Sequence, residues 1–186
     1  MPPPGLVSGS ILSSASSKTS QMAQLARAVE LGLYEWLVST QVAGVASGLP
    51  PSGPPGQLTG VLTVTPNASL MEGAFKGNGI VGSLASVMWM PIMIGVCKPY
   101  TFTGESVGVG AGGFVGTFVG DPFLLTESLY LSFGTNGIVG PEAFRICSAL
   151  GQGISALFIA SPAIGGVVGA TVAPGPLSAP AIGFMI

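Results

Sequence analysis

A five-residue phrase that occurs twice constrains this chain more than any other feature. Asn-Gly-Ile-Val-Gly stands at residues 78–82 and again at 136–140, 58 residues later. Phe75 and Phe133 precede the two copies at the same offset. A match of this length is not expected by chance, even in a chain with 30 glycines. The sequence therefore predicts an internal duplication.

The residues after each copy predict a short helix. Pro141 at the first helical position, Glu142 in the first turn and a glycine at the stop predict a helix over 141–150. After the first copy, the residues 83–90 predict the matching helix, which Pro91 ends or kinks.

Each predicted helix is followed by an extended run with regularly spaced glycines. These runs cover residues 101–120 in one copy and 162–173 in the other, and both predict β-ribbons. The first run would leave an apolar, aggregation-prone edge if it stood alone in water, so it should meet another unit or another chain. The residues that define this assembly ribbon are Val107, Val109, Phe114, Val115 and Phe118.

The first sixty residues follow a similar plan without the repeated phrase. An apolar stripe predicts a helix from about residue 20 to 39, and residues 40–45 and 58–64 read as extended. Whether this segment is a true third copy is left open.

These observations predict an α+β fold made of a pseudo-repeat of about three helix-plus-β-ribbon units packed as one body. A single unit of this kind cannot bury its own apolar face, so the units should stack within the chain and across subunits. The predicted organisation is an extended N-terminal arm at 1–18, the first unit at 19–66, the second at 67–127 and the third at 128–186.

The charge content predicts an assembled protein. Only 6% of the residues are charged, whereas a soluble domain usually carries about 25%. A surface with so few charges should be covered by copies of the chain, by other proteins or by lipid. The net charge of −2 and the scattered cations give no footprint for nucleic acid.

The residue types needed for catalysis are missing or isolated. The chain has no histidine, which is the commonest general base and metal ligand. Cys97 and Cys147 stand alone and are expected to be buried thiols. We therefore expect no enzymatic activity, no cofactor, no metal site and no small-molecule substrate.

Two glycine-containing motifs are interpreted as structural features and not as binding sites. Gly108-x-Gly110-x-x-Gly113 matches the dinucleotide fingerprint in letters, but glycines continue beyond it and favour a strand over the required helix. The Asn-Gly pairs are typical of type I′ turns. The expected structural turns comprise Asn78, Gly79, Gly82, Asn136, Gly137 and Gly140.

A membrane protein is the alternative reading. Residues 79–97 form an uncharged run of bilayer length between two lysines. Pro91 and several glycines and serines within this run argue against a lipid-facing helix. The alternative is thus a small integral membrane protein whose helices pack on glycine.

The phrase Asn-Gly-Ile-Val-Gly-Pro-Glu-Ala at 136–143, the Ala/Gly-rich helix after it and the glycine-rich alternating strands resemble small structural proteins of tailed-phage virions. The resemblance covers the second and third units; the first lacks the phrase, and the second has Ser83 in place of the proline. It implies a repeated tail, neck or baseplate subunit located in the virion, whose partners are copies of itself and other structural subunits.

Overall fold

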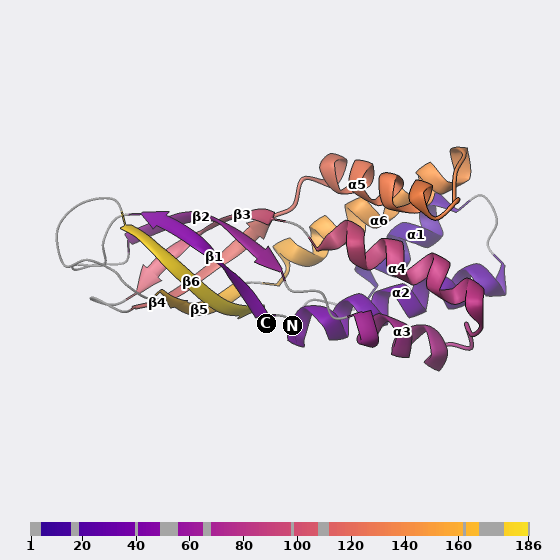
Figure 1. Ribbon diagram of the computed structural model, residues 1–186, viewed down its shortest axis with the longest axis horizontal. Coiled ribbons are helices and arrows are strands. Elements are labelled where there is room, and N and C mark those ends of the chain that lie inside the picture. Colours follow the sequence, from indigo (N-terminus) through magenta and orange to yellow (C-terminus); the bar gives the residue numbers. More distant parts are fainter. Residues whose placement is uncertain are drawn as a thin grey trace.

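The molecule consists of a helical body and a β-barrel that lie end to end along its long axis (Figure 1). The computed structural model describes residues 5–15, 19–39, 41–48, 56–64, 68–97, 99–107, 112–161, 163–167 and 177–185.

Two helices followed by two strands occur three times along the chain. We call each such set of four elements a unit. The first unit contains α1 (Leu6–Ser14), α2 (Ser20–Ser39), β1 (Gln41–Gly48) and β2 (Gly56–Val64). The second contains α3 (Ala68–Gly77), α4 (Ser83–Val96), β3 (Pro99–Val107) and β4 (Gly112–Val119). The third contains α5 (Pro122–Thr135), α6 (Pro141–Ile159), β5 (Ala163–Val167) and β6 (Leu177–Met185).

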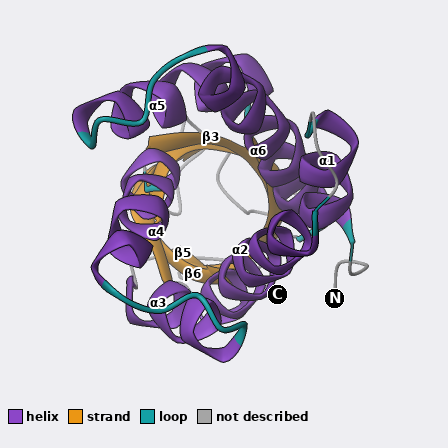
Figure 2. Ribbon diagram, turned by 90° about the vertical axis from the view of Figure 1, so that its right-hand side faces the viewer, coloured by secondary structure: helices purple, strands orange, loops and turns teal. Residues whose placement is uncertain are grey.

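The six helices of the described residues form a closed ring around the long axis (Figure 2). Each helix packs on its two neighbours in chain order, and α6 returns to α1. The second helices of the three units point equivalent side chains into the core. Val29, Ile92 and Leu150 are each 1% exposed. The ring therefore buries on its inside the apolar stripes that a single hairpin would leave in water.

The six strands form a closed barrel in chain order, with β6 pairing back to β1. All six neighbouring pairs are antiparallel, and Val45 of β1 lies opposite Val61 of β2 and Pro180 of β6. Closure gives every strand two partners, so the described strands leave no open sheet edge.

The predicted fold class, an α+β pseudo-repeat of about three helix-plus-β-ribbon units packed as one body, is wrong. Most residues whose side chains the structure describes lie in helices, and these helices pack on each other. The ribbons do not cover the helices but close on one another beside them. The physical reason is that the helices of the neighbouring units already cover the apolar face of the two helices in each unit. No layer of strands is needed there.

The helical content was underestimated at several points. The expected extended arm at 1–18 contains helix α1, whose first turn is capped by Glu30: its carboxylate accepts hydrogen bonds from the backbone N–H of Gly5 and the hydroxyl of Ser8. A carboxylate at a helix N-terminus satisfies free N–H groups and complements the helix dipole.

Predicted helix breakers lie inside two of the helices. α4 continues through Pro91 to Val96, and α6 continues through Gly151 to Ile159. Gly151 is needed for packing, because a Cβ there would stand 2.7 Å from the carbonyl oxygen of Pro122 in α5. By contrast, the helix expected at 20–39 and the extended segments expected at 40–45 and 58–64 are confirmed over their described residues.

Candidate assembly face and the junction of helices and barrel

The two Asn-Gly segments have one backbone shape, and it is not the predicted type I′ turn. Only the glycines have positive φ, 79° at Gly79 and 78° at Gly137, whereas a type I′ turn also needs positive φ at the asparagine. The N–H of Ile80 donates to the carbonyl of Phe75, and the N–H of Gly79 donates to that of Lys76. This pair of bonds is the Schellman motif that ends a helix.

The third unit repeats these bonds. Ile138 donates to the carbonyl of Phe133, and Gly137 donates to that of Gly134. The side-chain amides of Asn78 and Asn136 each donate to the carbonyl four residues earlier. The repeated phrase therefore marks the C-terminal ends of α3 and α5, two helices that sequence reasoning missed.

Gly82 and Gly140 place the next helix in each unit. The φ and ψ angles are 100° and 177° at Gly82, and 112° and 177° at Gly140. This region of backbone conformation favours glycine. Both stand directly before the first residue of α4 or α6. The six expected turn residues thus set the angle between α3 and α4 in the second unit and between α5 and α6 in the third. That the likeness arose by duplication stays a prediction.

The assembly ribbon lies in β3 and β4. Val107 pairs with Gly113, and the backbone of Phe118 lies opposite Phe102. Phe114 and Val115 pair with β5 on the other side. Val109 lies outside the described residues. The ribbon is extended and meets the first unit through β2 and the third through β5, so its backbone partners are within the chain.

One glycine from each second helix lets the next unit approach closely. A Cβ on Gly95 of α4 would stand 2.7 Å from Cδ2 and 3.2 Å from Cα of Leu129 in α5. Gly32 of α2 has the same relation to α3, and Gly153 of α6 to α1. The three contacts join consecutive units around the ring. This contact occurs once in each unit, and no single stretch of the sequence predicts it.

Three aromatic rings, one from each unit, meet where the helices reach the barrel. The ring of Phe158 lies 4.8 Å from that of Tyr100 and 6.4 Å from that of Trp36, measured between centroids. All three side chains are buried. The Tyr100 hydroxyl donates to the Val96 carbonyl at 2.5 Å. Burial, together with the nearby Cys97 thiol, raises the pKa of this hydroxyl. We call these three residues the aromatic junction.

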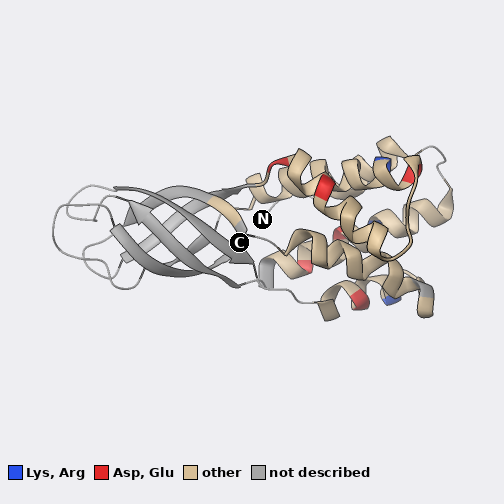
Figure 3. Ribbon diagram, turned by 45° about the horizontal axis from the view of Figure 1, so that its top comes forward, with Lys and Arg blue, Asp and Glu red and all other residues tan. Residues whose placement is uncertain are grey.

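The outer surface of the ring carries an uneven distribution of apolar side chains. On α4 and α5, which are neighbours in the ring, several large apolar residues are exposed. We call this surface the α4–α5 face; its members are Met90, Ile94, Phe123, Leu124 and Leu131. Charged residues on the helical body are few and scattered (Figure 3).

Both cysteines are free thiols, as far as the described residues show. Cys147 is buried, and Cys97 is half-buried rather than buried as expected. Burial raises the pKa of Cys97 to about 11 and that of Cys147 to about 12. Neither thiol is activated as a nucleophile, because a reactive cysteine needs a lowered pKa.

Within the described ranges, no three His, Cys, Asp or Glu side chains come together in a way that could hold a metal ion. Within the part of the chain that the structure describes, no helix combines the length and the apolar character needed to cross a bilayer. No family model, curated protein or solved structure matches this chain.

Proposed function

We propose that this protein is a non-catalytic structural subunit of a large assembly of the virion type, and that it contacts neighbouring subunits through the α4–α5 face. The comparison of the three units with one another carries the proposal. Ile94, one residue before the packing glycine of α4, is 57% exposed. The residues in the same place are the polar Gln152 on α6 and Leu31 on α2, which is 44% exposed, so Ile94 is the most exposed apolar residue at this position.

The first helices show a clearer difference. Leu131 of α5 follows the packing residue Leu129 by two positions and is 71% exposed. The corresponding residues are Gly73 after Met71 in α3 and Gly9 after Val7 in α1. The fold therefore does not require an exposed leucine there. Its presence on one face out of three indicates a role outside the monomer.

The charges of this face fit an apolar contact. α4 contains no charged residue, and α5 carries Glu127 as its single charge. Two exposed ion pairs lie elsewhere on the helices, Lys76–Glu72 in α3 and Arg145–Glu142 in α6. Each pair joins two residues of the same helix. Such pairs contribute little to association. Burial of apolar area, at about 25 cal/mol per Å², is the main driving force expected for assembly.

The test is sedimentation velocity of the purified chain. The double variant Ile94→Gln with Leu131→Gln makes the face more polar. Its first substitution introduces the residue that α6 has at the equivalent position, Gln152. We expect wild type to associate and this variant to associate at least ~10-fold more weakly, since a tenfold change needs only about 1.4 kcal/mol. Leu31→Gln on α2, 44% exposed at the position equivalent to Ile94, is the matched control and should associate like wild type.

A salt series separates apolar from charged contacts. Screening weakens charge–charge terms only, so the association constant should change little between low and molar salt. A monodisperse wild-type monomer, or a polar variant that associates as strongly as wild type, would contradict the proposal. For the virion placement, the chain should co-sediment with purified particles and should not float with lipid vesicles.

A further inference from the structure

Helix α1 closes the ring of helices by lying between α6 and α2 (Figure 2). On α6 it packs against Gly153, and the hydroxyl of Ser10 donates to the carbonyl of Ala149 at 2.8 Å. On α2, the carboxylate of Glu30 accepts hydrogen bonds from the start of α1, one of them from the hydroxyl of Ser8. We call the surface that holds this helix the α1 groove; its residues are Glu30, Ala149 and Gly153.

Of the three first helices, α1 has the smallest apolar anchors. Val7, Met71 and Leu129 occupy the same place, directly against the packing glycine of another helix. The residue four positions later is at most 2% exposed in each helix, and it is aromatic in α3 and α5 but aliphatic in α1. These residues are Phe75, Phe133 and Ile11.

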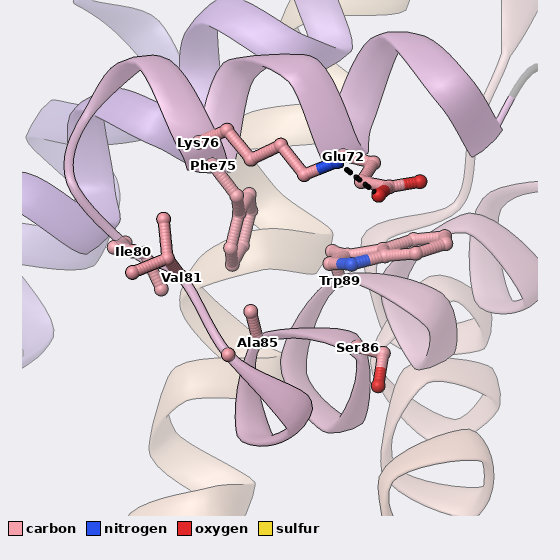
Figure 4. A pocket seen from close by; sticks show the side chains of 9 residues that line it. Glu72, Phe75, Lys76, Ile80, Val81, Ala85, Ser86 and Trp89 are labelled. Atoms are coloured by element: carbon pink, nitrogen blue, oxygen red, sulfur yellow. Dashed lines mark ion pairs between the residues drawn. The ribbon is translucent and has the colours of Figure 1, made fainter.

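The aromatic anchor of the second unit shows what α1 lacks. Phe75 points from α3 towards α4, where it lines an open cavity together with Trp89 (Figure 4). An aromatic ring buries more apolar area than a branched aliphatic side chain such as that of Ile11. Less apolar burial therefore holds α1 in the ring than holds α3 or α5.

The sequence of α1 also gives little intrinsic helix stability. The helix has nine residues, whereas an isolated helix needs about 12–15 to be even marginally stable in water. Four of the nine are serines and one is glycine, residue types that favour other backbone conformations over a helix interior. α1 is therefore helical because it is docked, and its local opening costs less free energy than that of the other first helices.

α1 is also the one first helix that does not continue from a strand of the described barrel. α3 follows β2 and α5 follows β4, so both are tied to the barrel where they begin. The barrel closes directly from β6 to β1, with no strand before α1 among its six described strands. α1 can therefore leave the ring while all six strands stay paired.

We propose that the α1 groove of one copy binds α1 of a second copy when the chain assembles. The missing Cβ of Gly153 admits the backbone of a helix at one point, and hydrogen-bond acceptors on α2 and α6 lie beside it. Val7, Ser8 and Ser10 have the spacing that meets these three points. The helix that fits this groove is α1 itself, so the partner is a second copy of this chain.

This exchange adds a second contact to the proposed assembly. The contacts within one copy are replaced by the same contacts between two copies, so mainly the freedom lost on association opposes it. The α1 groove and the α4–α5 face lie on opposite sides of the ring (Figure 2). One copy can therefore use both contacts at the same time.

Hydrogen exchange of the wild-type chain in dilute solution tests whether α1 leaves its groove. We expect the amides of α1 to exchange at least ~10-fold faster than those of α3 and α5, which serve as internal controls. Equal protection of the three helices would overturn the proposal, because α1 would then open only when the whole fold opens.

A pair of complementary variants tests docking between copies. The donor, Gly153→Leu, has a filled groove and an intact α1. The acceptor, Val7→Asp with Ile11→Asp, has an open groove and an α1 that cannot dock, because two charges would be buried. Sedimentation velocity of the mixture should show a one-to-one complex, at least ~100-fold tighter than the association of either variant with itself.

Two further changes to the donor identify the contact. Adding Ile11→Asp should abolish the complex. Adding Gly9→Ala should not weaken it, since a Cβ at this position meets nothing within 4 Å. Gly153→Ala and Ile11→Ser are the milder changes that replace the donor and acceptor substitutions should either variant not fold, as judged by circular dichroism.

A mixture without a one-to-one complex, or a complex that persists when the donor carries Ile11→Asp, would overturn the proposal. Donor and acceptor both also carry Ile94→Gln and Leu131→Gln, which remove the apolar side chains of the α4–α5 face. Formation of the complex therefore does not depend on that face, and the two proposals can fail separately.

Discussion

Gly153 of α6 packs directly on the backbone of Val7 in α1, where a Cβ would stand 2.9 Å from the valine Cα. This contact closes the ring of helices, because it joins the third unit to the first. The two helices are far apart in the chain, and only the missing side chain of the glycine allows their backbones to come this close. Ring closure therefore depends on this position.

Gly153→Ala should destabilise the protein although alanine is the better helix former. Because the obstructing atom belongs to the backbone, α1 must move away from α6, and overpacking of this kind costs about 1–3 kcal/mol. Gly9→Ala on α1 is the control. A Cβ there meets nothing within 4 Å, so the variant should gain about 0.5–1 kcal/mol in helix propensity. Urea unfolding followed by circular dichroism measures both, and equal effects of the two substitutions would contradict the close approach.

Gly137→Ala should destabilise the turn that joins α5 to α6. Its φ of 78° is left-handed, and an L-residue pays about 1–2 kcal/mol to adopt it. The matched change Gly134→Ala, inside α5 with open space around it, should be neutral or stabilising. Gly79→Ala and Gly77→Ala repeat the comparison in the second unit. A loss at Gly137 without a loss at Gly79 would show that the two turns are not energetically equivalent.

The sequence predicts the parts of this fold that depend on local pattern. The helix at 20–39 follows from its apolar stripe, and the repeated phrase correctly marks two equivalent turns. The Asn-Gly pairs predict type I′ turns because sequence alone does not distinguish such a turn from a helix C-terminus. The difference lies in the sign of φ at the asparagine, which is positive in a type I′ turn and is not positive here.

Features that depend on distant segments could not be predicted. The sequence around Gly32, Gly95 and Gly153 does not indicate a close helix contact, because their partners lie in another unit. The aromatic junction likewise combines side chains from three separate places in the chain. Barrel closure depends on β6 returning to β1, which no local pattern encodes.

Tyr100→Phe tests the hydrogen bond within the aromatic junction. The substitution keeps the ring and removes the donor to the Val96 carbonyl, so a buried acceptor loses its partner. We expect a loss of about 1–2 kcal/mol in the free energy of unfolding. Tyr130→Phe on α5 is the control, since that ring packs against Phe144 near the surface; its effect should stay within about 0.5 kcal/mol. Similar losses in both variants would mean that the Tyr100 hydroxyl has no special role.

Alkaline pH should destabilise the protein through the same buried groups. Burial raises the pKa of Cys97 to about 11 and that of Cys147 to about 12 from an ordinary value of 9, and it also raises the pKa of Tyr100. Below pH 9 these groups are protonated in both the folded and the unfolded chain, so they leave stability unchanged. Above pH 9 the unfolded chain releases their protons while the folded chain retains them, so the unfolding free energy falls as pH rises.

Cys147→Ala removes one of the titrating groups and should reduce the slope of stability against pH between pH 9 and 11. The substitution also removes a buried sulfur atom, so the variant should be less stable than wild type at pH 7, where titration plays no part. Urea unfolding at closely spaced pH values separates the two effects, because the loss at pH 7 is a constant offset and the titration changes the slope. An identical slope in wild type and variant would mean that the Cys147 thiol ionises as readily in the folded chain as in the unfolded one.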